Sequence, residues 1–380
     1  MKSEQLRWSN NDGWKKVGDL NLEGKADVVF VFGDRKSICQ EENVKYLKEK
    51  YPHAHLFGCS TSGEICNTEV TDNCIVATAV CFEKTQVRKE TVTVAGKDNS
   101  FDAGEKLASQ LDQAGLKHVF VLSEGLGING SELVKGISKH LPEGVTVTGG
   151  LAGDGTSFEQ TCILDTIKSA SNAVTALAFY GESIQVSYAS LGGWDSFGPE
   201  RVVTRSEGNV LYELDGKSAL EIYKSYLGEQ AKGLPATGLL FPLSIRTKDN
   251  DTAIVRTILA VDEATQSITF AGDIPEGCYA RLMKANFDRL VDGAIGAANV
   301  VAEPFDKNQI DLALLVSCVG RKLVLGQRVE EEVEGVREIL GPNTVMTGFY
   351  SYGEISPFTA NAKCELHNQT MTITAFSEKK

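Results

Sequence analysis

The hydrophobic pattern of this chain repeats three times. In each repeat an apolar run of strand length is followed by an amphipathic segment, a second apolar run and a loop bounded by glycines, over residues 28–65, 119–154 and 312–355. Within the amphipathic segments the apolar residues recur at the spacing of one helix face. Continuous apolar strands flanking such a helix are typical of sheets covered by helices. The pattern therefore predicts an α/β (mixed α+β) fold of repeated βαβ-type units, with mixed sheets covered by helices.

The segments between the repeats follow other patterns. Residues 253–259 and 267–270 are strand-like and flank a turn-rich stretch, which predicts an antiparallel hairpin. Helical spacing predicts helices over residues 218–227 and within 282–301. Apolar residues alternate with threonine over residues 368–376, which predicts a final strand with Met371, Ile373 and Ala375 on one face.

A polar, glycine-containing stretch at residues 206–216 separates two halves that both have α/β character. Such a shift in composition is the usual signal of a boundary between domains. We therefore predict an N-terminal extension over residues 1–25, an α/β domain over 26–215 and a second α/β domain over 216–380.

The charge balance excludes two classes of partner. Lys plus Arg number 38 and Asp plus Glu number 51 among 380 residues, so the formal charge is 38 − 51 = −13. Nucleic acid and anionic membranes are bound by clustered basic residues. We therefore expect neither a nucleic acid nor a membrane as partner.

The cysteines and the start of the chain indicate a reducing compartment. There are nine cysteines, an odd number, and no C-x-x-C pair. The first residues lack the apolar core of a signal peptide, and no apolar run approaches the ~18 residues of a membrane helix. We expect a cytoplasmic protein whose cysteines are mostly packed as small hydrophobic residues.

The glycine-bounded loops are the first candidates for chemistry. Glycine is unusually frequent, at 37 residues, and much of the excess lies just after predicted strand ends. Such loops build ligand pockets in open α/β sheets, but glycine also serves tight backbone crossings with no ligand. An acid follows the loop in each repeat: Glu64, Asp154 and Glu354. These carboxylates are candidates for binding an amine, a metal or a hydroxyl, or for capping a helix.

A second candidate lies after the first strand of the third repeat, at Ser317-Cys-Val-Gly-Arg321. Cys318 beside a cation is a suitable place for a reactive thiol, and the alternative is a packed cysteine. The guanidinium of Arg321 is a suitable partner for the carboxylate of a ligand, and the alternative is an internal ion pair. We leave both alternatives open at this point.

Five motifs together resemble the FIST family, across nearly the whole chain. They are Gly58–Ile65, Gly149–Asp154, Ser317–Arg321, Gly348–Pro357 and Leu366–Met371. The resemblance implies a FIST N domain followed by a FIST C domain, and a sensory, ligand-binding role in signal transduction without enzymatic activity. It also implies a small-molecule ligand and a signalling partner protein such as a histidine kinase.

The resemblance extends to the free-standing FIST proteins that bind haem and sense nitric oxide. It implies haem as a cofactor, with His367 as the ligand of the haem iron, since this is the one histidine inside a family motif. The other residues expected at the ligand site are Ser60, Thr61, Glu64, Asp154, Cys318, Arg321, Tyr350, Tyr352, Glu354 and Asn368. Two alternatives are a sensor of an amino acid or other small carboxylate, held by Arg321, and a cysteine-dependent enzyme using Cys318.

Overall fold

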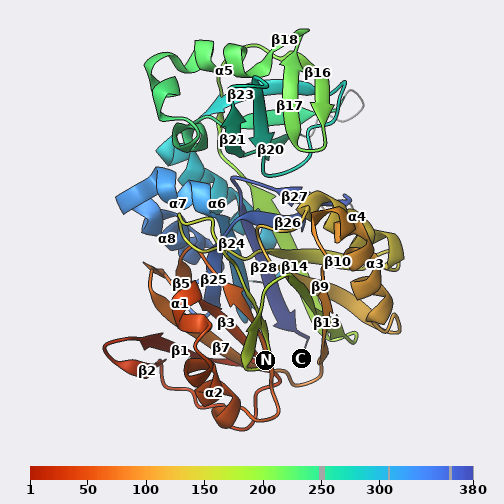
Figure 1. Ribbon diagram of the computed structural model, residues 1–380. Helices are drawn as coiled ribbons and strands as arrows, with labels where there is room; N and C mark the ends of the chain where they lie inside the picture. Colours follow the sequence, from red (N-terminus) through yellow and green to blue (C-terminus); the bar gives the residue numbers. More distant parts are fainter. Residues whose placement is uncertain (248–252, 307–308, 359–361, 380) are drawn as a thin grey trace.

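A computed structural model describes residues 1–247, 253–306, 309–358 and 362–379. The chain forms two bodies, which we call the base and the cap (Figure 1). The base holds three mixed sheets and carries both termini, and the cap is a smaller body formed by residues 195–284. The cap is inserted between two elements of the base, β14 (Ile184–Leu191) and α6 (Phe287–Ala302).

The three sheets of the base share one plan. In order, the first sheet is β12 (Lys168–Ala170), β11 (Ile163–Asp165), β4 (His55–Ser60), β3 (Val28–Gly33), β7 (Cys74–Cys81), β1 (Lys2–Ser9) and β2 (Gly13–Val17). The second is β27 (Cys364–His367), β26 (Gly353–Pro357), β10 (Thr146–Leu151), β9 (Leu116–Ser123), β13 (Ala173–Tyr180) and β8 (Gln86–Thr93). The third is β6 (Glu69–Thr71), β5 (Glu64–Cys66), β25 (Val345–Ser351), β24 (Leu312–Cys318), β28 (Met371–Glu378) and β14.

The helices lie between the strands of these sheets along the chain. They are α1 (Arg35–Ile38), α2 (Glu41–Lys50), α3 (Ser100–Gln110), α4 (Gly130–His140), α6, α7 (Val319–Leu325) and α8 (Val329–Leu340), with short 3-10 turns at Lys97–Asn99 and Gly326–Arg328. A parallel pair forms the centre of each sheet, namely β3 with β4, β9 with β10, and β24 with β25. The helix of each βαβ unit is therefore α2, α4 or α8, as the repeats of the sequence predict.

The three units exchange strands in a cycle. The first unit gives β5 to the sheet of the third, where Ile65 lies opposite Gly348. The third gives β26 to the second, with Ile355 opposite Gly149, and the second gives β11 to the first, with Ile163 opposite Cys59. Each sheet is therefore completed by a neighbour. β5 lies before residue 215 and pairs with β25 after it, and β26 lies after residue 215 and pairs with β10 before it. Strand pairing therefore crosses the boundary that was predicted there.

The first glycine of each predicted loop lies inside a strand of the parallel pair, Gly58 in β4, Gly149 in β10 and Gly348 in β25. A Cβ atom at Gly58, Gly149 or Gly348 would lie within 1.9 Å of a backbone carbonyl oxygen of the adjacent parallel strand. No side chain fits in that space, so glycine is needed for the close crossing of the backbones. These three glycines therefore serve a tight backbone crossing, which was the structural alternative left open by the sequence.

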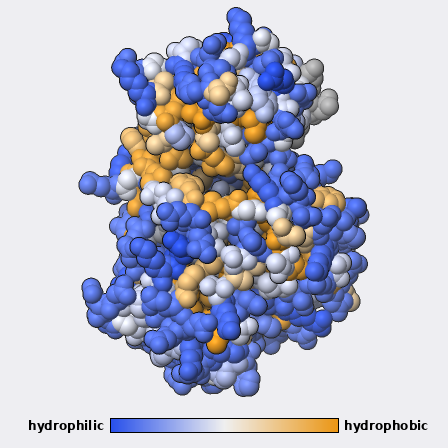
Figure 2. Space-filling model, in the orientation of Figure 1, coloured by the Kyte–Doolittle hydropathy of each residue, from blue (hydrophilic) through white to orange (hydrophobic). Residues whose placement is uncertain are grey.

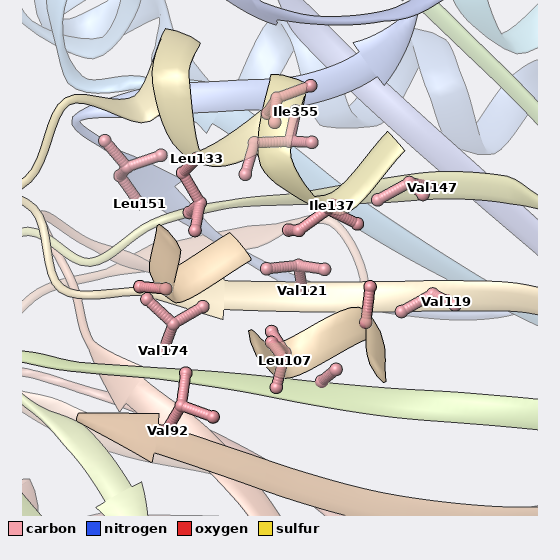
Figure 3. Close-up of a cluster of buried hydrophobic side chains, with 14 of the residues drawn as sticks. Val92, Leu107, Val119, Val121, Leu133, Ile137, Val147, Leu151, Val174 and Ile355 are labelled. Atoms are coloured by element: carbon pink, nitrogen blue, oxygen red, sulfur yellow. The ribbon is translucent and has the colours of Figure 1, made fainter. Parts of the chain in front are cut away.

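An exchanged strand takes part in the core of its new sheet. Figure 3 shows Ile355 of β26 beside Leu133 and Ile137 of α4, over Val121 of β9, and all four side chains are buried. A change in any one unit therefore affects the packing of another.

The cap is an antiparallel sheet with helical segments beside it. It contains β15 (Asp195–Ser196), β16 (Arg201–Glu207), β17 (Val210–Leu214), β18 (Lys217–Ser218), β19 (Leu243–Arg246), β20 (Ile254–Arg256), β21 (Ile258–Asp262), β22 (Ser267–Phe270) and β23 (Tyr279–Lys284). Its helical segments are α5 (Ala219–Leu227) and two 3-10 segments at Gly228–Gly233 and Ala236–Leu240.

Several sequence predictions are confirmed by these elements. The fold is mixed α/β, and α5, α6 and β28 lie where they were expected. The predicted hairpin is confirmed in part: β22 pairs with β21, which begins only at Ile258, whereas Ile254–Arg256 form a separate strand, β20, that pairs with β19. Residues 206–216, where the boundary between domains was predicted, lie in the β16–β17 hairpin of the cap. Polar residues alternate there because one face of the hairpin is exposed.

Candidate functional site

A cavity of about 760 Å³ lies between the cap and the base, which we call the interbody cavity. The base lines it with residues from loops 125–130 and 151–158 and with Lys97, Cys318, Val319, Leu323 and Tyr352; the cap lines it with residues from 233–239, 257–259 and 270–272 and with Asn209. The base residues come mainly from the loops that follow β9, β10, β24 and β25. The cavity therefore lies at the strand-end loops where a ligand site was predicted.

The rim of this cavity is unusually apolar. Phe158, Leu259 and Leu323 all line it and remain 42%, 44% and 41% exposed. Figure 2 shows hydrophobic residues gathered around a hollow between the two bodies. Large exposed apolar side chains that converge on a concavity are typical of ligand sites.

One wall of the cavity is held by Asp154. Its carboxylate accepts hydrogen bonds from the backbone N–H groups of Phe158, Glu159 and Gln160, at 2.9–3.0 Å, and from the hydroxyl of Tyr352. The rings of Phe158 and Tyr352 stack, with centroids 4.5 Å apart. Asp154 therefore positions one wall of the cavity and is not itself a lining residue.

Two polar groups of the lining have no partner among the described residues. The hydroxyl of Thr257 is buried and makes no hydrogen bond, although such groups are normally paired. Lys97 is exposed at the cavity and forms no ion pair with any described residue. The Thr257 oxygen is not exposed to the cavity, whereas the ammonium of Lys97 is, and an apolar cavity with an unpaired ammonium group suits a ligand that carries an anionic group.

Polar contacts join the two bodies beside the cavity. The carboxylate of Asp273 in the cap accepts a hydrogen bond from Asn129 at 3.1 Å and lies 3.4 Å from the ammonium of Lys135. Arg256 in the cap donates to the carbonyl of Leu366 in the base at 2.8 Å, and burial lowers the pKa of its guanidinium to about 10. These contacts set the present distance between cap and base.

Cys318 lies on the floor of the cavity and is 2% exposed. Burial, with the nearby Glu354, raises the pKa of its thiol far above neutral pH, so the thiolate is disfavoured. This environment supports the packed alternative for Cys318 over the nucleophile.

Behind the floor lies a buried polar cluster around Glu354. Its carboxyl accepts hydrogen bonds from the hydroxyl of Ser351 at 2.6 Å and from the N–H and hydroxyl of Thr370 at 3.2 and 2.9 Å. Burial raises the pKa of Glu354 to about 8. Asn368, two residues before Thr370, is fully buried, and its side-chain amide has no hydrogen-bond partner among the described residues. Neither residue lines the cavity.

Arg321 and Tyr350 lie elsewhere and meet at Glu332 of α8. Arg321 donates to the Glu332 carboxylate at 2.7 and 3.1 Å and to the carbonyls of Gly192 and Leu290. The Tyr350 hydroxyl donates to the same carboxylate at 2.7 Å, and all three side chains are fully buried. For Arg321 the structure thus shows the internal ion pair that was left open as an alternative, and the Tyr350 hydroxyl is used by the same carboxylate.

Ser60, Thr61 and Glu64 form the counterpart of the Glu354 cluster in the first unit. Thr61 donates to the carboxyl of Glu64, Cys74 lies 3.2 Å from it, and burial raises the pKa of Glu64 to about 8. The hydroxyl of Ser60 accepts the N–H of Cys162 at 2.9 Å. All three predicted residues are buried at the strand exchange, and none of them lines the interbody cavity.

His367 does not fit the expected role of haem ligand. Its side chain is 1% exposed, it does not line the cavity, and its Nε2 donates to the carbonyl of Ser356 at 2.8 Å. Burial lowers the pKa of His367 to about 4. Within the described ranges, no three His, Cys, Asp or Glu side chains form a group that could hold a metal ion. Across the same residues, no helix is long and apolar enough to span a membrane.

Most of the cavity lining was missed from the sequence. A signal existed for the loop after β9, where three glycines fall within Gly125-Leu-Gly-Ile-Asn-Gly130. No local signal marks Thr257, Leu259 or the 233–239 segment, because they become lining residues only when the cap lies over the base. Of the predicted residues, Cys318 and Tyr352 line the cavity and Asp154 supports its wall.

Comparison with known proteins gives family matches along most of the chain. The FIST N domain matches residues 27–217 and the FIST C domain matches residues 219–357. An uncharacterized protein of Methanocaldococcus jannaschii, MJ1623, is 24% identical over 351 residues, which cover 82% of this chain and 64% of that protein. This chain thus spans less than two thirds of that relative. A solved structure of cyanuric acid hydrolase from A. caulinodans has 9% identity and a TM-score of 0.23, covering 78% of this chain and 68% of that one, too little likeness to carry an argument.

Proposed function

This chain belongs to the FIST family, whose domains are associated with small-ligand sensing in signal transduction, and we propose that it senses an apolar carboxylate bound in the interbody cavity. The observation that carries the proposal is the cavity itself. Its volume of about 760 Å³ falls in the usual range for small-molecule sites, and its lining is mostly apolar.

The two unpartnered polar groups define the ligand class. The ammonium of Lys97 suits one carboxylate within an otherwise apolar lining, and the buried hydroxyl of Thr257 becomes available to a ligand only if its side chain rotates toward the cavity. The sequence analysis gave a sensor of a small carboxylate as one alternative, with Arg321 as the cation that holds it. The present proposal keeps the carboxylate but assigns the cation to Lys97, because Arg321 forms an ion pair with Glu332.

A ligand that touches both bodies provides a signal. The cap and the base each contribute lining residues, so a bound molecule favours one relative position of the two bodies over others. A partner protein such as a histidine kinase is the proposed reader of this change.

The test is thermal unfolding against a panel of aromatic and medium-chain carboxylates, with the matching alcohols and amides and free amino acids as comparisons. A ligand at 100 times its Kd raises the free energy of unfolding by about 2.7 kcal/mol, so a saturable rise in Tm is expected for carboxylates. Lys97→Gln should weaken the response, whereas Lys106→Gln, a change at an exposed lysine of α3, should not. A panel without any saturable response, or equal responses to acids and alcohols, would overturn the proposal.

Location is tested separately with a blocking variant. Ala271 lines the cavity and is half-buried, so Ala271→Trp should fill part of the space and abolish the response while leaving the circular dichroism spectrum unchanged. A response that persists in this variant would place the ligand elsewhere.

Haem belongs in the same panel, because it is an apolar dicarboxylate. The haem and nitric-oxide version of the function predicts a Soret band that shifts with nitric oxide. A band lost in His367→Ala would support the donor inferred from the resemblance, and a band lost in Ala271→Trp but kept in His367→Ala would assign haem to the cavity. Absence of a band would refute this version.

A further inference from the structure

The fold brings two cysteines together that are 123 residues apart in the sequence. The Sγ atoms of Cys39 and Cys162 lie 3.0 Å apart. Cys39 caps the C-terminal end of α1 and is exposed, whereas Cys162 directly precedes the exchanged strand β11 and is 4% exposed. An exposed sulfur in contact with a buried one is the arrangement of a reactive cysteine beside a resolving cysteine.

We propose that Cys39 and Cys162 form a reversible oxidation site for peroxide. The Cys39 thiolate attacks one peroxide oxygen, which breaks the O–O bond and gives a sulfenic acid; the leaving hydroxide takes a proton and becomes water. The Cys162 thiol then loses its proton and attacks the sulfenic sulfur, and the hydroxyl group leaves with that proton as a second water. In total, two thiols and one peroxide give one disulfide and two waters, so the sulfurs are oxidised and the peroxide is reduced.

The surroundings of the pair favour this order of attack. Hydrogen bonds from Cys162 and Ser169, together with the charge of Arg35, lower the pKa of Cys39 to about 6 against the effect of burial. The same contact raises the pKa of Cys162, so this thiol stays protonated until it resolves the sulfenic acid. At neutral pH the nucleophilic sulfur is therefore the exposed one.

The remaining cysteines are poor competitors. Cys39 is the one exposed cysteine, and all nine cysteines lie in the described part of the chain. Burial raises the pKa of the others, namely Cys59, Cys66, Cys74, Cys81, Cys278, Cys318 and Cys364. Oxidation should therefore be selective for the Cys39–Cys162 pair.

The pair sits beside the loop that forms the wall of the interbody cavity. Arg35 of α1 donates to Gln160 at 3.1 Å and lies 3.7 Å from Glu159 in that loop. A disulfide between Cys39 and Cys162 would add a covalent link between α1 and this loop, four residues after Phe158. The oxidation site thus stands independently of any ligand, but its closure constrains a segment that lines the cavity.

The test is tryptic mass spectrometry of the whole protein after mild peroxide treatment, without reducing agent. Cleavage after Lys and Arg places Cys39 in peptide 37–45 and Cys162 in peptide 140–168, so the expected product is these two peptides linked, two hydrogens lighter than their sum. Cys39→Ser should abolish the product and Cys81→Ser should leave it unchanged. In Cys162→Ser, Cys39 should instead be trapped as a sulfenic acid by dimedone.

A second measurement uses the reduced protein and does not depend on peroxide. At about pH 6.5, iodoacetamide should alkylate Cys39 at least about ten-fold faster than Cys81, with a pH midpoint well below that of a free thiol. Absence of the linked peptides in protein that keeps its circular dichroism spectrum would overturn the proposal. Random pairing among cysteines, or alkylation of Cys39 with the midpoint of a free thiol, would overturn it as well.

Discussion

Replacing Glu354 by glutamine should remove a large part of the pH dependence of stability. Glu354 is fully buried in β26, where its carboxyl oxygens accept hydrogen bonds from Ser351 and Thr370. Burial raises its pKa from 4.5 to about 8, because the charged form loses its hydration. Glutamine has the shape of the neutral acid and cannot ionise, so Glu354→Gln mimics the protonated form at every pH.

The sign and size of the effect follow from proton linkage. The folded chain holds this proton more tightly than the unfolded chain, so the stabilisation is complete below about pH 4.5 and is lost as the pH rises through about 8. Between about pH 5.5 and pH 8.5, a shift of this size corresponds to a loss of about 3 kcal/mol in the free energy of unfolding. Glu64, whose pKa is also raised to about 8 by burial, adds a loss of the same kind.

The assay is urea unfolding followed by circular dichroism at several pH values across that range. Glu354→Gln should lose about 3 kcal/mol less than the wild type between the two ends of the range. Glu64→Gln should behave in the same way, and Glu49→Gln, a change at an exposed glutamate of α2, should follow the wild type. An unchanged pH dependence in Glu354→Gln would show that the carboxyl is ionised in the folded protein, and would refute the reasoning from burial.

Three further substitutions test the packing of the base. A Cβ at Gly149 would lie 1.9 Å from a carbonyl oxygen, so Gly149→Ala should destabilise by at least about 3 kcal/mol in urea unfolding, whereas Gly144→Ala, with nothing within 4 Å, should cost no more than about 2 kcal/mol. Arg321→Met should cost about 3–5 kcal/mol because it leaves the Glu332 carboxylate buried and unpaired, and adding Glu332→Gln should recover part of that loss. Asp154→Ala should speed proteolytic cleavage of loop 154–160, because the backbone N–H groups of this loop lose the carboxylate to which they donate hydrogen bonds. Equal cleavage rates in the variant and the wild type would contradict the conclusion that Asp154 holds the loop.

The sequence predicted what is local in this fold. Periodicity within each repeat depends on neighbouring residues, so the strands and helices of the three units could be predicted. The exchange could not, because β5 and β11 are three residues long and their partners lie far away along the chain. Arg321 shows the same limit at the level of one residue: its type and position suited both a ligand and an ion pair, and only the packing of α8 beside it decides between them.

The position of the interbody cavity follows from where the three units differ. In the first and third units the exchanged strand follows the loop glycine at once, so Glu64 and Glu354 are drawn into a sheet and buried. In the second unit the exchanged strand β11 begins only at residue 163, nine residues after Asp154. Asp154 therefore lies outside the sheet and organises the intervening loop, which supplies Phe158 to the cavity.

The cap is a second departure from the common plan, because it is inserted between β14 of the third sheet and α6, and the first two sheets have no comparable insertion among the described residues. The cavity-lining residues thus come mainly from a loop and an insertion that the exchanged strands do not require. Substitutions at Phe158 or Leu259 should therefore change ligand preference with little effect on the three sheets, whereas substitutions at Gly58 or Gly348 should unfold the base before they change any ligand contact.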